Sequence, residues 1–284
     1  MADAARTIPA VKGETGARDL SIAVGVVIAM SRFAPDGFVW PIAIVLLAGV
    51  ILGSLQVVGE ADPATDGSGV AIEALLLPGA AALAALGAIR LVPMGVVLAP
   101  AFLLAGGLIG LTLVTELRIA RASGPPSSAD RTAVLIEVLL VGFFGFAGVA
   151  VLVPGGLPTP GATGATDATS ASTAIDVIAQ AVGDGIIALL LAYRVAAMRS
   201  SNLRDVAWFG ITGAAVVAIA AVALRSIEIP RILGPALLVL VFFLWDAIHA
   251  GSPGRRRDPR RIWETAALAL LALVVIGWSL GLRA

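Results

Sequence analysis

The run AVLIEVLLVGFFGFAGVAVLV, residues 133 to 153, contains a single ionisable side chain, Glu137, and is preceded by Arg131. A helix needs about 20 mainly apolar residues to cross the hydrocarbon core of a bilayer. This run therefore predicts a membrane-spanning helix. Runs of the same kind recur along the chain, so the predicted fold class is all-α, a polytopic transmembrane helix bundle.

The composition supports a membrane environment. Hydrophobic residues make up 59% of the chain and charged residues 13%, and the mean hydropathy is +1.00. Soluble domains carry about 25% charged residues. Lipid, rather than water, is therefore the solvent expected for most of the surface.

The apolar runs predict about nine helices, or eight if the short first run does not span. The expected spans are Leu20–Ser31, Val39–Val57, Val70–Ile89, Leu91–Thr115, Ala133–Val153, Ala174–Met198, Val206–Leu224, Ile232–Ile248 and Ile262–Leu282. Residues 1–19 are expected to form a cytoplasmic N-terminal arm, and residues 20–284 a single transmembrane domain. The Gly/Pro/Ala/Thr-rich tract 154–173 has no helical periodicity and predicts a loop on the outer side.

The cationic residues are sorted between alternate junctions. Fourteen of the 19 lysines and arginines lie in the N-terminal arm and in the junctions after the fourth, sixth and eighth expected helices. Basic short loops face the cytoplasm. The sequence therefore predicts a cytoplasmic N-terminus and an outer C-terminus, and its richness in arginine and alanine suggests a bacterial inner membrane.

Several classes of site are excluded by residue counts. The chain has no cysteine, one histidine and no net charge at pH 7. Disulfides, cysteine-ligated clusters and multi-histidine metal centres cannot form from this set. We expect no cofactor, no nucleic-acid partner and no recognisable catalytic set, which favours a protein that is not an enzyme but leaves an enzyme open.

One carboxylate is predicted to lie deep in the membrane. Asp184 is near the middle of its expected helix, and Asp176 and Gln180 precede it at four-residue steps on the same face. Ionisable residues in spans are candidates for function because each costs roughly 2.5–3.5 kcal/mol at a helix centre. The stripe could line a solute or proton path, or Asp184 could hydrogen-bond across the bundle and hold helices together.

Other polar residues are predicted at the membrane interface. Glu73, Glu137 and Glu264 lie near the cytoplasmic starts of their helices, where the helix dipole favours a carboxylate. Asp246 and His249 are three residues apart and can share a helix face. They could form a proton relay or a plain interfacial contact, and the sequence is compatible with both. The similar settings of the three glutamates suggest repeated helical hairpins, although chance similarity explains them equally well in so apolar a sequence.

Prolines and glycines inside the apolar runs predict two further structural features. Pro78 and Pro100 lie well inside expected helices, so they predict kinks that could open a cavity near the midplane. Glycines at positions 142, 145 and 148 predict close helix packing.

Three functions are compatible with these features. The first is a structural, assembly or partner-subunit membrane protein, in contact with membrane lipids and forming a homo-oligomer or part of a complex. The second is a small-solute or proton-coupled permease that uses the stripe around Asp184. The third is a Mg²⁺-dependent lipid-phase transferase with Glu60, Asp62 and Asp66 as weak candidate metal ligands, since carboxylates are the ligands that Mg²⁺ prefers.

Overall fold

The computed structural model describes residues 10–59, 72–122, 124–153, 174–200, 202–226 and 233–249, with a few separate positions between 263 and 277. Within these residues all regular elements are helical. In chain order they are α1 (Ala10–Ser31), η1 (Asp36–Phe38), α2 (Val39–Gly59), α3 (Glu73–Ala88), η2 (Ile89–Leu91), α4 (Leu98–Arg121), α5 (Ser128–Leu152), α6 (Ala174–Ala197), α7 (Leu203–Ser226) and α8 (Leu233–His249).

Six of the described helices, α2 to α7, are long and apolar enough to cross a membrane. The helix α8 is apolar but shorter, with 17 residues. The predicted all-helical, membrane-like fold is therefore confirmed, while the count of nine spans stays a prediction. Most of the ninth expected span, including Glu264, lies outside the described residues, as does the tract 154–173.

The starts of two helices differ most from the sequence prediction. The first begins at Ala10 rather than Leu20, so half of the expected N-terminal arm is helical. The fourth begins at Leu98 rather than Leu91, because Pro93 breaks the helix and Gly95 adopts φ 140°, a conformation that favours glycine. Pro100 consequently lies in the first turn of α4, where proline is well tolerated, and it does not kink the helix.

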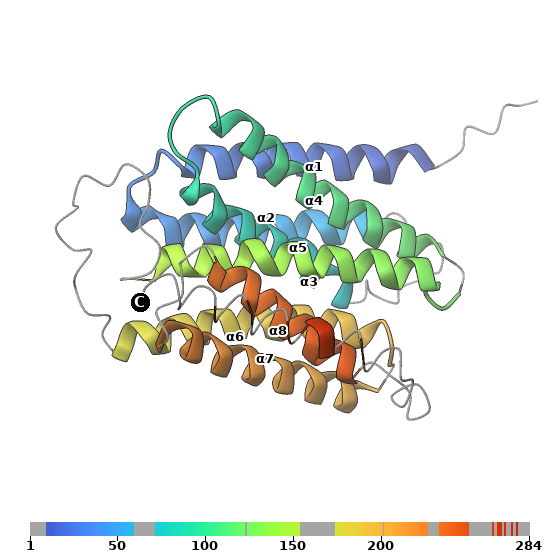
Figure 1. The fold of residues 1–284 in the computed structure, drawn as a ribbon. Helices are drawn as coiled ribbons and strands as arrows, with labels where there is room; N and C mark the ends of the chain where they lie inside the picture. Colours follow the sequence, from blue (N-terminus) through green and yellow to red (C-terminus); the bar gives the residue numbers. More distant parts are fainter. Residues whose placement is uncertain are drawn as a thin grey trace, which may run out of the picture.

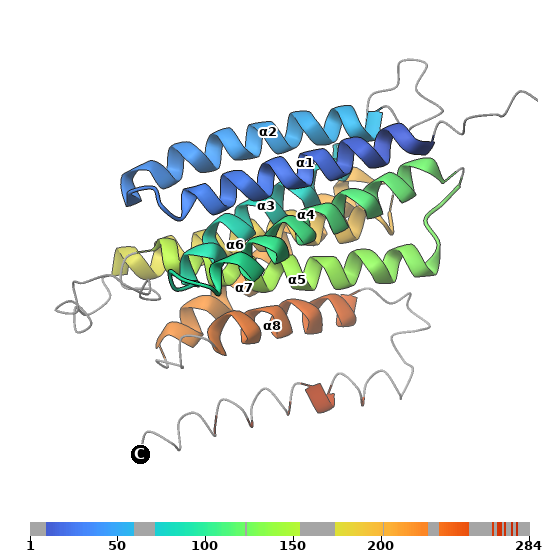
Figure 2. The same cartoon turned by 90° about the horizontal axis from the view of Figure 1, so that it is seen from above.

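The helices lie side by side with their long axes nearly aligned (Figures 1 and 2). On one side of the bundle lie α1 and α2, on the other α7 and α8, with α3 and α5 between them. The central helix α3 packs against α1, α2, α4, α5 and α6. Its many alanines allow this crowding, since small side chains let neighbouring backbones approach closely.

The closest of these approaches joins α3 to α5. A Cβ added to Gly87 would lie 2.5 Å from the Cα of Gly148, and one added to Gly148 would lie 2.9 Å from the Cα of Gly87. No side chain fits at either position without moving the backbone. The close packing predicted from the glycines of α5 is therefore confirmed at this crossing.

Two buried arginines hold one end of the bundle. Arg32, after α1, donates through Nε to the carbonyl oxygen of Val92 at 3.2 Å. Arg90, in η2, donates through Nη2 to the carbonyl oxygen of Ala34, also at 3.2 Å. Each arginine thus satisfies a carbonyl of the other's turn, and the α1–α2 and α3–α4 turns are tied together.

Candidate functional site

At the other end of the bundle, which we call the charged end, four ion pairs join described residues. Here α1, α5 and α7 begin and α4, α6 and α8 end. The pairs are Arg121–Glu14 at 3.0 Å, Arg118–Asp130 at 3.1 Å, Arg194–Glu116 at 2.6 Å and Arg199–Asp246 at 2.7 Å. Together they connect five helices or their flanking turns, and they contain four of the fourteen cations that the sequence sorts to one side.

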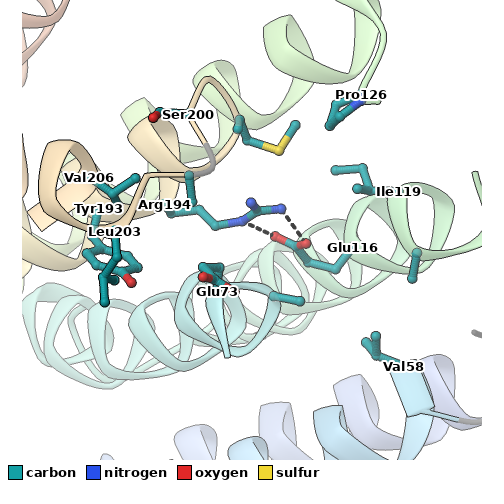
Figure 3. A pocket seen from close by; sticks show the side chains of 14 residues that line it. Val58, Glu73, Glu116, Ile119, Pro126, Tyr193, Arg194, Ser200, Leu203 and Val206 are labelled. Atoms are coloured by element: carbon teal, nitrogen blue, oxygen red, sulfur yellow. Dashed lines mark hydrogen bonds and ion pairs between the residues drawn. The ribbon is translucent and has the colours of Figure 1, made fainter. Parts of the chain in front are cut away.

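The Arg194–Glu116 pair is the most deeply buried of the four. Arg194 on α6 donates through Nε and Nη2 to the two carboxylate oxygens of Glu116 on α4, at 2.7 and 2.6 Å (Figure 3). The side chains are only 6% and 1% exposed. Such a planar, two-bond geometry is the strongest that arginine makes with a carboxylate. It offsets part of the large cost of removing two charges from water.

Glu137 on α5 lies beside this pair. The Thr115 hydroxyl, adjacent to Glu116 on α4, donates a hydrogen bond to Glu137 Oε1. The other carboxylate oxygen, Oε2, is buried and has no hydrogen-bond partner within the described residues. Two carboxylates and one guanidinium are thus concentrated in a small buried volume, with one oxygen unsatisfied.

A cavity of about 450 Å³ borders the Glu116–Arg194 pair (Figure 3). Its wall comes from the first turns of α3 and α7, the last turns of α2, α4 and α6, and the turns after α4 and α6. The ionisable and polar lining residues are Glu73, Glu116, Tyr193, Arg194 and Ser200. The rest of the wall is apolar, so the cavity combines a few polar groups with a mainly hydrophobic surface.

The structure places the predicted interfacial residues at the charged end in different settings. Glu73 is the first residue of α3 and lines the cavity. Asp246 is held by Arg199 through two hydrogen bonds of 2.7 and 2.9 Å, a partner that the sequence did not predict. The His249 ring nitrogen Nδ1 lies 2.8 Å from the carbonyl oxygen of Trp245.

Asp184 lies in the middle of α6, fully buried. Neither carboxylate oxygen has a hydrogen-bond partner among the described residues. One turn earlier, the Gln180 side-chain oxygen accepts a hydrogen bond from Arg225 on α7. Asp176, in the first turn of α6, is partly exposed. The predicted stripe thus runs inward along α6, but Asp184 does not line the cavity at the charged end.

No described part of the chain offers a metal centre. Across the described ranges, no group of three His, Cys, Asp or Glu side chains could hold a metal ion. The weak candidates Glu60, Asp62 and Asp66 lie outside the described residues, so a metal site there stays a prediction.

Sequence reasoning missed the residue at the centre of the site. The expected fourth span ends at Thr115, one residue before Glu116. The helix in fact continues to Arg121. The signal was present, because the apolar residues Leu117 and Ile119 extend the run and place Glu116 inside the last turns of a helix.

The chain matches no protein-family model, and it has no significant match among curated proteins or solved structures. Its function must therefore be inferred from its own residues. Three features of the charged end bear on it: the cavity, the buried pair of Glu116 and Arg194, and the carboxylates of Glu73 and Glu137.

Proposed function

We propose that this protein is a polytopic membrane permease that binds a small solute in the cavity at the charged end. The observation that carries this proposal is a cavity of about 450 Å³ with the buried Glu116–Arg194 pair in its wall. Sites for small molecules have volumes of roughly 300–1,000 Å³ and a mainly apolar wall with a few polar groups. Ionisable residues inside membrane helices commonly mark the path of a solute or a proton.

The helix α6 connects the cavity with the interior of the bundle. Arg194 lies in the cavity wall, and Asp184 lies ten residues earlier, about 15 Å along the helix axis. From there Gln180 and Asp176 continue toward the opposite end. We propose that a solute or proton leaving the cavity passes along this face of α6. The tight packing around Asp184 corresponds to a state closed on that side.

The proposed placement in the membrane follows the sorting of arginines. Nine spans, with the N-terminus in the cytoplasm and the C-terminus outside, put the charged end on the cytoplasmic face of a bacterial inner membrane. In this placement the cavity opens toward the cytoplasm, and the end held by Arg32 and Arg90 faces outward.

A structural or partner-subunit role is the second candidate. The observation in its favour is the exposed apolar surface of α2, where Ile44, Val45 and Leu52 are each at least two-thirds exposed. Such a surface contacts lipid or a partner helix. In this role the ion pairs only hold the helices together, and the cavity binds no solute.

Single-cysteine labelling distinguishes the two functions, because the chain has no natural cysteine. Ala197→Cys places a thiol in the cavity wall, and Ala188→Cys places one on the buried face of α6 one turn after Asp184. Ala215→Cys, on the exposed surface of α7, is the matched control. The reagent is a membrane-impermeant, charged methanethiosulfonate, applied to vesicles of defined orientation.

A permease predicts reaction of Ala197→Cys from the cytoplasmic side and slower reaction of Ala188→Cys from the outer side. The control should stay unlabelled because lipid covers it. If Ala197→Cys fails to react from either side, the cavity holds no water and the proposal fails. If Ala197→Cys reacts and Ala188→Cys never does, water enters the cavity but no path continues past Asp184. The cavity would then bind a solute without transporting it.

A further inference from the structure

Among the described residues that line the cavity at the charged end, carboxylates outnumber cations. Its ionisable lining residues are Glu73, Glu116 and Arg194. The guanidinium of Arg194 is engaged with both oxygens of Glu116, so these two charges neutralise each other. Glu73 remains, and no described cation pairs with it. One carboxylate without an ion-pair partner in the described part of the chain therefore lines the space that a ligand would fill.

A second buried carboxyl group lies close to the cavity wall. Glu137 is 3% exposed and lies next to the Glu116–Arg194 pair, and its Oε2 atom has no hydrogen-bond partner within the described residues. The nearest other arginine on α4, Arg118, is 57% exposed and pairs with Asp130. Its charge is therefore largely screened by water and by its own partner. Among the described residues at this end, Arg194 is thus the one buried cation beside these carboxyl groups.

The rest of the wall suits an apolar body. Ile119, Met198, Leu203 and Val206 supply aliphatic and thioether surface, and Tyr193 supplies the single tyrosine ring of the chain. An aromatic face attracts a cation through its quadrupole, and a methionine side chain adapts to irregular apolar shapes.

We infer that the ligand of this cavity is an organic cation, a protonated amine or quaternary ammonium with an apolar body. This inference rests on the proposed role of the cavity as a solute site. Glu73 is the counter-ion, Tyr193 contributes a cation–π contact, and the aliphatic wall covers the apolar part. An anion in the cavity would lie beside Glu73, whose carboxylate repels it.

Two probe ions of the same shape and opposite charge test the inference: tetraphenylphosphonium and tetraphenylborate. Their binding to the detergent-purified full-length protein is measured by equilibrium dialysis. We expect saturable binding of the cation alone. Glu73→Gln should weaken it at least tenfold, and Tyr193→Leu should weaken it while Tyr193→Phe retains it. Circular dichroism and size-exclusion chromatography establish that each variant is folded.

The matched control is Glu14→Gln, which removes a carboxylate at the same end that lies outside the cavity and pairs with Arg121. It should leave cation binding unchanged. Equal loss in Glu14→Gln and Glu73→Gln would show a general surface potential and overturn Glu73 as counter-ion. An unchanged affinity in Glu73→Gln would do the same.

Other outcomes separate this inference from the proposed function. If tetraphenylborate binds saturably and Ala197→Trp, which fills the cavity, abolishes this binding, the cavity is a solute site but its ligand is not a cation. If neither ion binds but Ala197→Cys is still labelled by the water-soluble reagent, the ligand class is wrong and the cavity remains. If neither ion binds and the thiol is also inert, both proposals fail.

Discussion

Glu116 and Arg194 are 78 residues apart in sequence, and they meet in two hydrogen bonds of 2.7 and 2.6 Å inside the bundle. The pair joins the last turns of α4 and α6. Neither side chain is more than 6% exposed, so each charge depends on the other for compensation. Because of this dependence, a substitution at either residue should affect both the stability of the bundle and binding in the cavity.

Removing one member of the pair should destabilise the protein strongly. Glu116→Gln or Arg194→Met leaves an uncompensated buried charge, at a cost of about 3–5 kcal/mol in the free energy of unfolding. The double variant Glu116→Gln/Arg194→Met removes both charges and should regain most of this loss. Denaturant unfolding in detergent, followed by circular dichroism, measures all three.

The control for this prediction is the exposed pair of Arg118 and Asp130. Arg118→Gln should cost about 0.2–1 kcal/mol, because water screens the pair. A double variant as unstable as the sum of its single variants would contradict the prediction, since it would show that the two charges act independently.

The fold was largely predictable from apolar runs. The expected bounds of α2 and α6 agree with the observed helices to within two residues, because a membrane helix must be continuous and apolar along its length. The start of α1 was not predictable in this way. Its first half carries Lys12, Glu14, Arg18 and Asp19, and a polar helix has no hydropathy signal.

The site was predictable only in part. The sorting of arginines placed many cations at one side, and the ion pairs of the charged end lie where it indicates. The sequence did not predict which acidic residue pairs with which arginine. Whether Asp246 contacts His249 or Arg199, for example, depends on how α6 and α8 pack. Pairing across helices is a tertiary property that local spacing does not contain.

The Gly87–Gly148 crossing should tolerate no side chain. Gly87→Ala puts a methyl group 2.5 Å from the Cα of Gly148, so α3 and α5 must separate. Overpacking of this kind typically costs about 1–3 kcal/mol. Thermal unfolding in detergent should show a lower midpoint for Gly87→Ala and for Gly148→Ala.

Gly107→Ala is the matched control, because an added Cβ on this α4 glycine meets nothing within 4 Å. Alanine is favoured over glycine in a helix by about 1 kcal/mol, so this variant should be equal to or more stable than the parent. A similar loss in all three variants would mean that the tight crossing has no special role.

The start of α5 should depend on its capping box. The Asp130 backbone N–H donates to Ser127 Oγ at 3.2 Å, and the Ser127 backbone N–H donates to Asp130 Oδ2 at 3.1 Å. Ser127→Ala should therefore cost about 0.5–2 kcal/mol. Hydrogen exchange of the first turn of α5 should rise in this variant and stay unchanged in Ser128→Ala, which keeps the cap. Equal exchange in both variants would rule out the cap as the feature that fixes this helix start.

The carboxyl group of Asp184 should lower the stability of the protein while being needed for its function. Both of its carboxylate oxygens are buried without a hydrogen-bond partner in the described bundle, and an unsatisfied buried polar group costs about 1–3 kcal/mol. Asp184→Ala removes that cost and should raise the free energy of unfolding. If α6 carries the solute or proton path, the same variant and Asp184→Asn should abolish uptake of the cation into vesicles. Ser54→Ala removes another buried, unpartnered oxygen on α2, and it should leave uptake unchanged. If Asp184→Ala were less stable than the parent, the carboxyl group would instead stabilise the bundle through hydrogen bonds between helices. Normal uptake by a folded Asp184→Asn variant would show that Asp184 is not part of the path.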